Sequence, residues 1–314
     1  MTKQDSAAPS SIQSTRHLWW HHAALLTRSL RMRTRLWYDV LVPLAMLAVM
    51  GGYSLPWHRV GLVIAALVLF HGGQTLFNDV ADVAVDRAST ERSRQQRALV
   101  RGSLSRSELL IAGSVLVAGA GVVSLFLPWP NQLLFVVSLP VVLAYNFKPV
   151  GLSGRPLATQ VFWPVTWLLM YVYCAAGLDF AGWQRGIPYL AFVAVFMGLG
   201  EGLCQDIRDL DNDRIGGRVT TPVRFGARST SAWAWLAFSA SVVPWFWHVR
   251  HTAMPIVAAS AGTVILLVWI ALSARAVRRI HKAYQKKDGK FLHTGSILAF
   301  TCVNVVILVA AALF

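Results

Sequence analysis

Apolar segments of bilayer length constrain the fold of this chain more than any other feature of its sequence. Nine such segments follow one another, each close to the roughly 20 residues that a helix needs to cross a membrane. They cover residues 37–55, 60–77, 108–128, 131–147, 157–178, 187–204, 230–248, 253–273 and 292–313. Helices satisfy their own backbone hydrogen bonds in lipid, so the pattern predicts an all-α, polytopic membrane bundle of about nine transmembrane helices.

Basic residues predict the orientation of this bundle. With the N-terminus in the cytoplasm, all but three of the 29 lysines and arginines lie on the cytoplasmic side, the exceptions being Arg59, Arg185 and Arg250. Nine spans then place the C-terminus on the opposite side, so we expect a multi-pass integral membrane protein. This orientation explains the net charge of +15, and we expect no binding to nucleic acid.

The first 36 residues differ in composition from the rest. Residues 1–15 are rich in Ser, Thr, Gln, Ala and Pro and are expected to be a disordered tail. Residues 16–36 mix Leu and Trp with Arg, the pattern of an amphipathic helix in the cytoplasmic interface, acting either as a membrane anchor or as a lid over a site. Residues 37–314 then form the nine-helix transmembrane domain. Within it, we expect the basic stretch 274–290 to be a solvated loop beside anionic membrane lipid.

Acidic residues are scarce and are concentrated in two windows. Eight of the 14 aspartates and glutamates fall within residues 79–86 and 201–213. Each window holds three aspartates at positions i, i+3 and i+7, namely Asp79, Asp82 and Asp86 in the first and Asp206, Asp209 and Asp213 in the second. On a helix this spacing places three carboxylates on one face, where they repel one another unless a cation binds. Because the same spacing occurs twice, we do not interpret the two windows as helix ends whose acidic side chains are only solvated.

One further acid stands apart from these windows. Asp39 lies at the mouth of the first apolar segment, where an ionisable group is costly. It either reaches water at the interface or takes part in function.

Both acidic windows end segments that run inward, so both reach the cytoplasmic edge of the membrane. Oxygen-only ligands select hard divalent cations such as Mg²⁺, which commonly bridges carboxylates to substrate phosphates. The arginines at 92–101 either mark the cytoplasmic side or bind phosphate. A diphosphate held at this edge, with a hydrocarbon chain in a central cavity that opens near the cytoplasmic face, is an isoprenyl diphosphate.

The two windows resemble the signature motifs of the UbiA superfamily of intramembrane prenyltransferases. The resemblance rests on Asn78-Asp79-x-x-Asp82-x-x-x-Asp86 and on Asp206-x-x-Asp209-x-x-x-Asp213, and it extends to the segments 145–148 and 217–226. It implies that all six aspartates bind Mg²⁺ and that Asp79, Asp82, Asp206 and Asp209 are catalytic. It also implies five ligands of the diphosphate: Asn78, Arg94, Arg97, Tyr145 and Lys148.

Several activities would use such a site. The resemblance implies Mg²⁺-dependent transfer of a prenyl group to a lipophilic acceptor, commonly an aromatic ring, through an allylic carbocation and with release of diphosphate. The alternative is a membrane terpene cyclase of the same superfamily, in which double bonds of the same chain attack the cation. A cation transporter would need carboxylates near the bilayer midplane, whereas these lie at segment ends among arginines.

Overall fold

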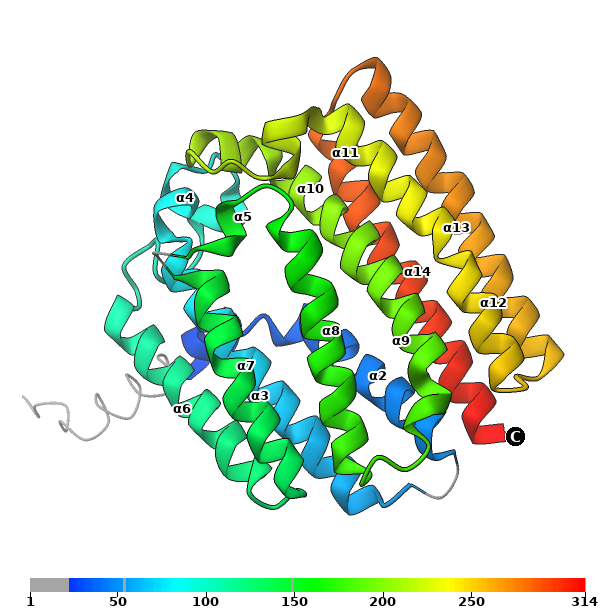
Figure 1. The fold of residues 1–314 in the computed structure, drawn as a ribbon. Helices are drawn as coiled ribbons and strands as arrows, with labels where there is room; N and C mark the ends of the chain where they lie inside the picture. Colours follow the sequence, from blue (N-terminus) through cyan, green and yellow to red (C-terminus); the bar gives the residue numbers. More distant parts are fainter. Residues whose placement is uncertain (1–22, 53–54, 148–149, 314) are drawn as a thin grey trace, which may run out of the picture.

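The structure, a computed structural model, describes residues 23–52, 55–147 and 150–313 (Figure 1). Within these ranges the chain forms helices and short connections and no strand, which confirms the all-α prediction. The expected disordered tail at 1–15 and the predicted diphosphate ligand Lys148 lie outside the described residues.

Long helices cover the nine predicted segments. They are α2 (Met32–Gly51), α3 (Trp57–Ala81), α6 (Arg106–Ser124), α7 (Trp129–Asn146), α8 (Ala158–Gly177), the continuous run of α9 (Ile187–Val193), η3 (Ala194–Glu201) and α10 (Gly202–Ile215), the pair α11 (Thr221–Ala240) and α12 (Val242–His251), α13 (Ile256–Lys282) and α14 (Lys286–Leu313). The short elements are α4 (Val83–Ala88), α5 (Arg92–Gln95), η1 (Leu152–Gly154) and η2 (Trp183–Gly186).

Five stretches of the described chain are long and apolar enough to cross a membrane by length and composition. They are α3, α6, Trp183–Ile215, α13 and α14, and Asp39–Gly51 is a shorter apolar helix. A membrane helical bundle is therefore confirmed, while the number of nine crossings stays a prediction.

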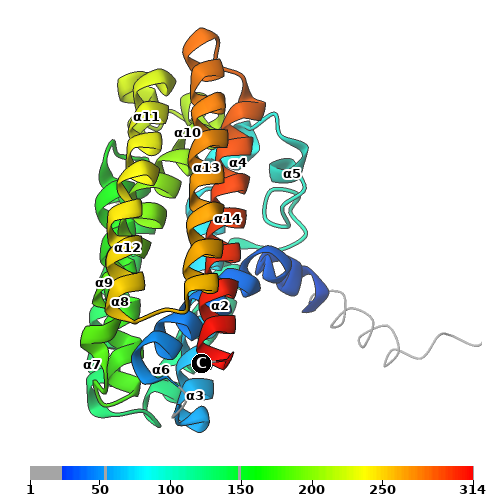
Figure 2. The same ribbon diagram turned by 90° about the vertical axis from the view of Figure 1, so that its right-hand side faces the viewer.

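The long helices run along one another and leave α4 and α5 at a single end of the bundle (Figures 1 and 2). α3 packs along α6, α13 packs along α14, and α10 contacts both α11 and α14. α4 in turn contacts α10, which brings together the two elements that carry acidic motifs. The C-terminus lies at the other end (Figure 1).

Buried aromatic rings pack together the helices that adjoin α10. Phe192 of α9 and Phe196 of η3 lie 5.9 and 5.8 Å, between ring centroids, from Phe300 of α14, and Phe196 lies 4.9 Å from Phe238 of α11. All four rings are buried. The π-helix η3 has more residues per turn than an α-helix. It therefore changes which residues face the neighbouring helices just before the second acidic motif.

Two boundaries differ from the expectations drawn from the sequence. The stretch 274–290 is not a loop, because α13 continues to Lys282 and α14 begins at Lys286. Low hydropathy marks where a helix leaves lipid, but Lys and Arg are good helix formers and continue it in water.

The N-terminal segment is helical at 23–29 and breaks at Arg31, with φ 53°, rather than near residue 36. Its role as an interfacial segment stays a prediction.

Candidate active site

The two acidic motifs meet at the end of the bundle that carries the short helices. The first motif runs from the last turn of α3 through α4, and the second lies within α10. Five of the six carboxylate residues are buried: Asp79, Asp82, Asp86, Asp206 and Asp213. Asp209 is slightly more open, with 17% of its side chain exposed.

Arg94 of α5 joins the two motifs. Its Nη1 donates to Asp86 Oδ1 at 2.9 Å, and its Nη2 donates to Asp209 Oδ1 at 2.6 Å. Arg97 also donates to Asp86, and its Nη1 lies 3.3 Å from Asp79 Oδ1. The arginine-rich loop therefore lies over both motifs, with guanidinium groups between the carboxylates.

Three arginines that the sequence analysis did not assign also reach the motifs. The pairs are Arg31 with Asp79, Arg218 with Asp82 and Arg208 with Asp209. Arg208 lies inside the second acidic window and Arg218 directly follows Gly217 in the 217–226 segment, so both were close to a sequence signal. Arg31 had only the amphipathic pattern of its segment as a signal.

Neutral donors hold other carboxylate oxygens. The bonds run from Thr159 Oγ1 to Asp206 Oδ2 at 3.0 Å, from Thr220 Oγ1 to Asp213 Oδ2 at 2.9 Å and from Asn78 Nδ2 to Asp82 Oδ2 at 3.0 Å. These donors orient the carboxylates without neutralising them. Neither threonine was assigned a role from the sequence: Thr220 lies in the 217–226 segment of the resemblance, whereas Thr159 had no distinctive signal.

Burial and neighbouring ions set the charges in the loop. Burial raises the pKa of Asp86 and outweighs Arg97 and Arg94, which lower it. Burial lowers the pKa of Arg94, but Asp209 and Asp86 leave that pKa above its usual value. Arg94 therefore stays cationic and is suited to binding an anionic group.

A polar chamber of about 370 Å³ lies between the motifs. Eight of the predicted site residues line it: Asn78, Asp82, Arg94, Arg97, Tyr145, Asp206, Asp209 and Asp213. Asp79 lines an adjoining basic chamber instead, and Asp86 is fully buried behind Arg94 and Arg97. The structure thus brings together all the predicted site residues that it describes.

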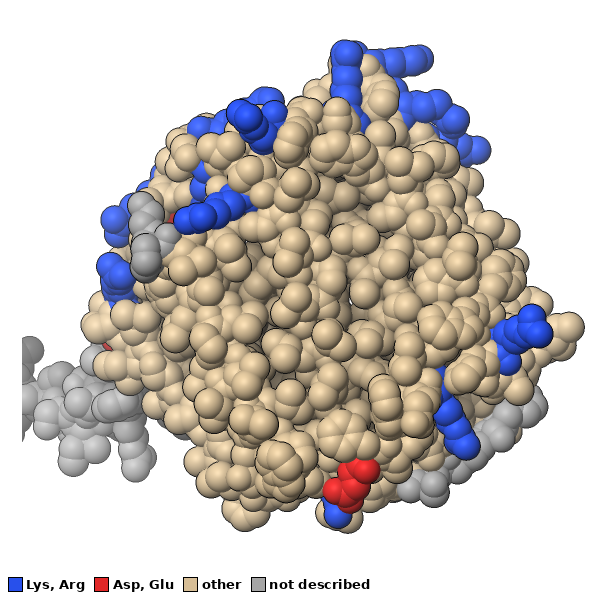
Figure 3. Space-filling model, in the orientation of Figure 1, with Lys and Arg blue, Asp and Glu red and all other residues tan. Residues whose placement is uncertain are grey.

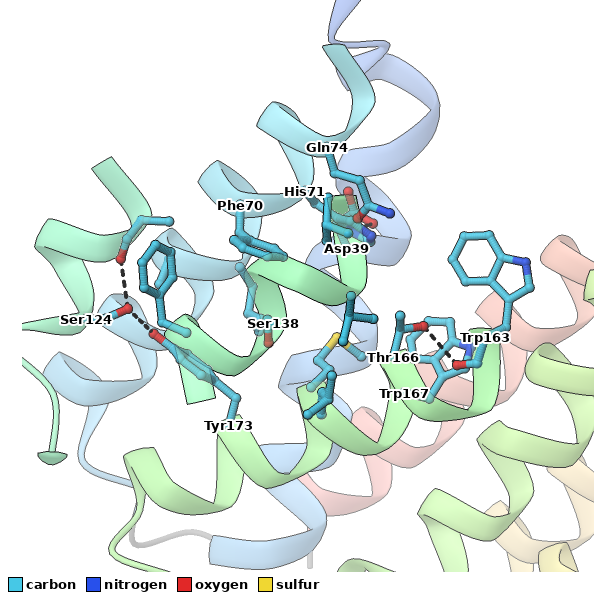
Figure 4. Close-up of a pocket in the computed structure, with 18 residues that line it drawn as sticks. Asp39, Phe70, His71, Gln74, Ser124, Ser138, Trp163, Thr166, Trp167 and Tyr173 are labelled. Atoms are coloured by element: carbon cyan, nitrogen blue, oxygen red, sulfur yellow. Dashed lines mark hydrogen bonds and ion pairs between the residues drawn. The ribbon is translucent and has the colours of Figure 1, made fainter. Parts of the chain in front are cut away.

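An apolar chamber of about 90 Å³ adjoins the polar one, between α3, α6, α7 and α8 (Figure 4). The two chambers share His71, Gln74 and Trp163 in their walls. The far end carries Ser124 and Tyr173, whose hydroxyl oxygens lie 2.7 Å apart. The charged lining of one space and the apolar lining of the other suit a molecule with a charged head and a hydrocarbon tail.

The carboxylates suit a hard cation in their donor chemistry. The six aspartates offer oxygen atoms only, from the junction of α3 with α4 and from α10, which contacts α4. Among the residues that the structure describes, no three His, Cys, Asp or Glu side chains gather into a metal-binding group, and arginines lie between the aspartates. Binding a cation would therefore require some carboxylates to exchange an arginine for the ion.

Comparison with curated proteins finds relatives of modest identity. The chain is 27% identical over 180 residues to the digeranylgeranylglyceryl phosphate synthase of Natronomonas pharaonis, covering 57% of this chain and 61% of that protein. It is 29% identical over 194 residues to the enzyme of the same name from Methanoregula boonei, covering 59% and 65%. The match thus spans less than two thirds of the length of these relatives.

Solved structures share the fold over nearly the whole chain. A digeranylgeranylglyceryl phosphate synthase structure superposes with a TM-score of 0.67 at 13% identity, covering 92% of this chain and 98% of that one. A UbiA homolog from Archaeoglobus fulgidus bound to GPP and Mg²⁺ gives 0.63 at 18% identity, covering 90% and 99%. At the level of sequence, the model of the UbiA prenyltransferase family matches residues 40–310. The chain therefore belongs to the UbiA prenyltransferase family.

Proposed function

We propose that this protein transfers the prenyl group of an isoprenyl diphosphate to a lipophilic acceptor within the membrane. The observation that carries the proposal is the junction of the two chambers: a polar space lined by both acidic motifs and by arginines opens into an apolar space at His71, Gln74 and Trp163. The diphosphate would bind in the first and the hydrocarbon chain in the second. The A. fulgidus homolog of the same fold is bound to GPP and Mg²⁺, which supports an isoprenyl diphosphate as the substrate.

Mg²⁺ would be held by the six aspartates, of which Asp79, Asp82, Asp206 and Asp209 are the proposed catalytic set. When bound, the metal would neutralise the diphosphate and so make it a better leaving group. Arg94 and Arg97 would turn from aspartates to phosphate oxygens, because guanidinium forks bind both groups in the same way.

Two aromatic rings lie at the junction of the chambers: Trp163 lines both of them and Tyr145 lines the polar one. Tyr145 stacks on Phe162 with ring centroids 4.0 Å apart, and Phe162 lies 5.3 Å from Trp163. Ring faces attract positive charge, so this cluster would stabilise an allylic cation. The apolar walls beyond it would exclude water from the cation.

Two observations favour different acceptors. The motif resemblance favours an aromatic ring, whereas the relatives are named as digeranylgeranylglyceryl phosphate synthases, which favours a glyceryl lipid phosphate. We propose the lipid phosphate as the first choice, because an adjoining chamber carries Arg28, Arg101 and Lys290, which suit an anionic headgroup. The aromatic acceptor remains the second candidate in the same assay.

The test is diphosphate release by the purified protein in detergent. Geranyl, farnesyl and geranylgeranyl diphosphate are supplied with Mg²⁺, first alone and then with geranylgeranylglyceryl phosphate or 4-hydroxybenzoate. We expect slow release alone, fast release with the correct acceptor, and none with EDTA. A cyclic hydrocarbon formed without acceptor would establish a cyclase instead, and the absence of any release would refute prenyl chemistry at this site.

A further inference from the structure

Asp39 and His71 form a pair that the proposed function has not used. Asp39 lies on α2 and His71 on α3, and Asp39 Oδ1 lies 3.0 Å from His71 Nδ1. The two side chains are only 10% and 26% exposed, and both line the apolar chamber, where Figure 4 shows them together beside Gln74. An ionisable pair in a largely apolar chamber is costly, so a merely structural role is a weak explanation for it.

The pair lies at the junction where the reaction would take place. His71 belongs to the walls of both chambers. It precedes Asp79 by eight residues on α3, which places it about 12 Å along the helix axis from the acidic motif. A diphosphate bound at that motif would direct its allylic carbon towards the apolar chamber and thus towards His71.

The hydrogen bond also selects which imidazole nitrogen is available. An ionised carboxylate such as that of Asp39 can only accept, so this contact assigns the proton of the neutral ring to Nδ1 and its lone pair to Nε2. A carboxylate on Nδ1 fixes the orientation and tautomer of the ring, as in the histidine-carboxylate pairs of hydrolases.

We propose that His71 is the catalytic base of prenyl transfer and that Asp39 positions it; the inference rests on the proposed function. The allylic C–O bond breaks and its electron pair leaves with the diphosphate. The acceptor atom then donates an electron pair to the allylic carbon. The hydrogen on that acceptor atom leaves as a proton to Nε2 of His71, and the imidazolium is held by Asp39. The proton is passed to water through the polar chamber.

The experiment separates ionisation from transfer. His71→Gln is compared with wild type using the acceptor that supports transfer in the assay above, and both total diphosphate and prenylated product are measured. We expect transfer to fall by about 100-fold or more, the usual contribution of a general base. Diphosphate release should fall far less, with prenyl alcohol replacing the transfer product. Added imidazole should restore transfer in His71→Ala.

Matched variants keep the test specific. His58→Gln makes the same substitution at an exposed position of the same helix and should leave both rates unchanged. Asp39→Asn should lower kcat about tenfold with little change in the acceptor KM, and Asp39→Glu should recover part of the loss. Transfer by His71→Gln at the wild-type rate would overturn the proposal, as would an equal loss of release and transfer. Failure of the wild type to release diphosphate would instead refute the proposed function.

Discussion

Asp209 is bound by two guanidinium groups at once. Arg94 Nη2 lies 2.6 Å from Asp209 Oδ1, and Arg208 Nη2 lies 2.6 Å from its Oδ2. Arg94 comes from α5 and Arg208 from α10, so one carboxylate fastens the arginine-rich loop to the second acidic motif. Removing its charge would leave two cations facing a neutral group, which is more damaging than loss of a single pair.

We therefore expect Asp209→Asn to lower prenyl transfer by at least about 100-fold, through loss of a proposed metal ligand and of the charge between the two arginines. Diphosphate release at several Mg²⁺ concentrations is the measurement. Asp211→Asn is the control, because two residues along α10 turn its side chain to another face. Activity of Asp209→Asn near that of the control, with the same Mg²⁺ requirement, would contradict the assignment.

At the scale of elements, Glu91 ties the arginine-rich loop to α14. Its Oε1 lies 3.0 Å from Lys286 Nζ and 3.2 Å from Lys290 Nζ, and its Oε2 lies 3.3 Å from Arg94 Nε. Burial alone would raise the pKa of Glu91, but Lys286 and Lys290 outweigh it and lower the pKa to about 2. We call the contacts of Glu91 with Lys286, Lys290 and Arg94 the Glu91 tether. Because the pKa of Glu91 is lowered, the stabilisation from this tether is fully present above the ordinary pKa of 4.5 and is lost only as the pH falls towards 2.

Glu91→Gln should raise the KM for the isoprenyl diphosphate roughly fivefold, since a partly exposed ion pair contributes about 1 kcal/mol. The kcat should change little, because Glu91 contacts Arg94 from the side and is not among the proposed metal or diphosphate ligands. In the wild type this tether should add no pH dependence to KM between about pH 5.5 and 8. Steady-state kinetics measure both constants. Asp179→Asn is the control, because the ion pair of Asp179 with Arg59 involves a mostly exposed carboxylate in a different region. An unchanged KM would show that the tether does not position the loop.

The π-helix η3 depends on close contact with α8. A Cβ at Gly198 would lie 2.8 Å from Cγ and 3.1 Å from N of Pro164, whose ring is part of the backbone and cannot move aside. Gly198→Ala should therefore destabilise the protein by about 1–3 kcal/mol. Thermal unfolding in detergent measures this. Gly61→Ala on α3 meets no atom within 4 Å and serves as the control. Equal unfolding temperatures for both variants would contradict this packing.

The elements also show what the sequence predicted and what it did not. The acidic motifs and their common end follow from local spacing, which one sequence displays directly. The partners of Arg31 and Arg218 lie 48 and 136 residues away in the chain, and hydropathy does not show which helix faces meet. For the same reason the junction of the chambers and the place of His71 in it were not predicted.

At the scale of the whole molecule, charge and apolar surface are separated. Lysine and arginine side chains gather along the upper margin in Figure 3, over the end that carries α4, α11 and the turn between α13 and α14, and the face below is largely free of them. Large apolar side chains are exposed on the helix surfaces, including Ile256 at 81% and Val243 at 73%. This distribution supports our proposal that the site end faces the cytoplasm.

Cysteine labelling in sealed vesicles tests both this orientation and the number of crossings. With nine spans, Ser103→Cys and Val150→Cys should react from the cytoplasmic side, and Phe126→Cys and Ala181→Cys from the other, because α6, α7 and α8 each cross between successive probes. If only the five long apolar stretches crossed, Val150→Cys would instead react on the same side as Phe126→Cys.

Wild-type protein is the control for this labelling, since Cys174 and Cys204 are buried and Cys302 is half-buried. Val150 is 42% exposed and Phe126 71%, so a substituted cysteine at either position is open to reagent. Reaction of Val150→Cys on the same, non-cytoplasmic side as Phe126→Cys would remove α7 and α8 from the spans. It would also place the connection that follows Tyr145 on the side of the membrane opposite to a cytoplasmic diphosphate. This one position therefore tests both the proposed site and the nine-span topology.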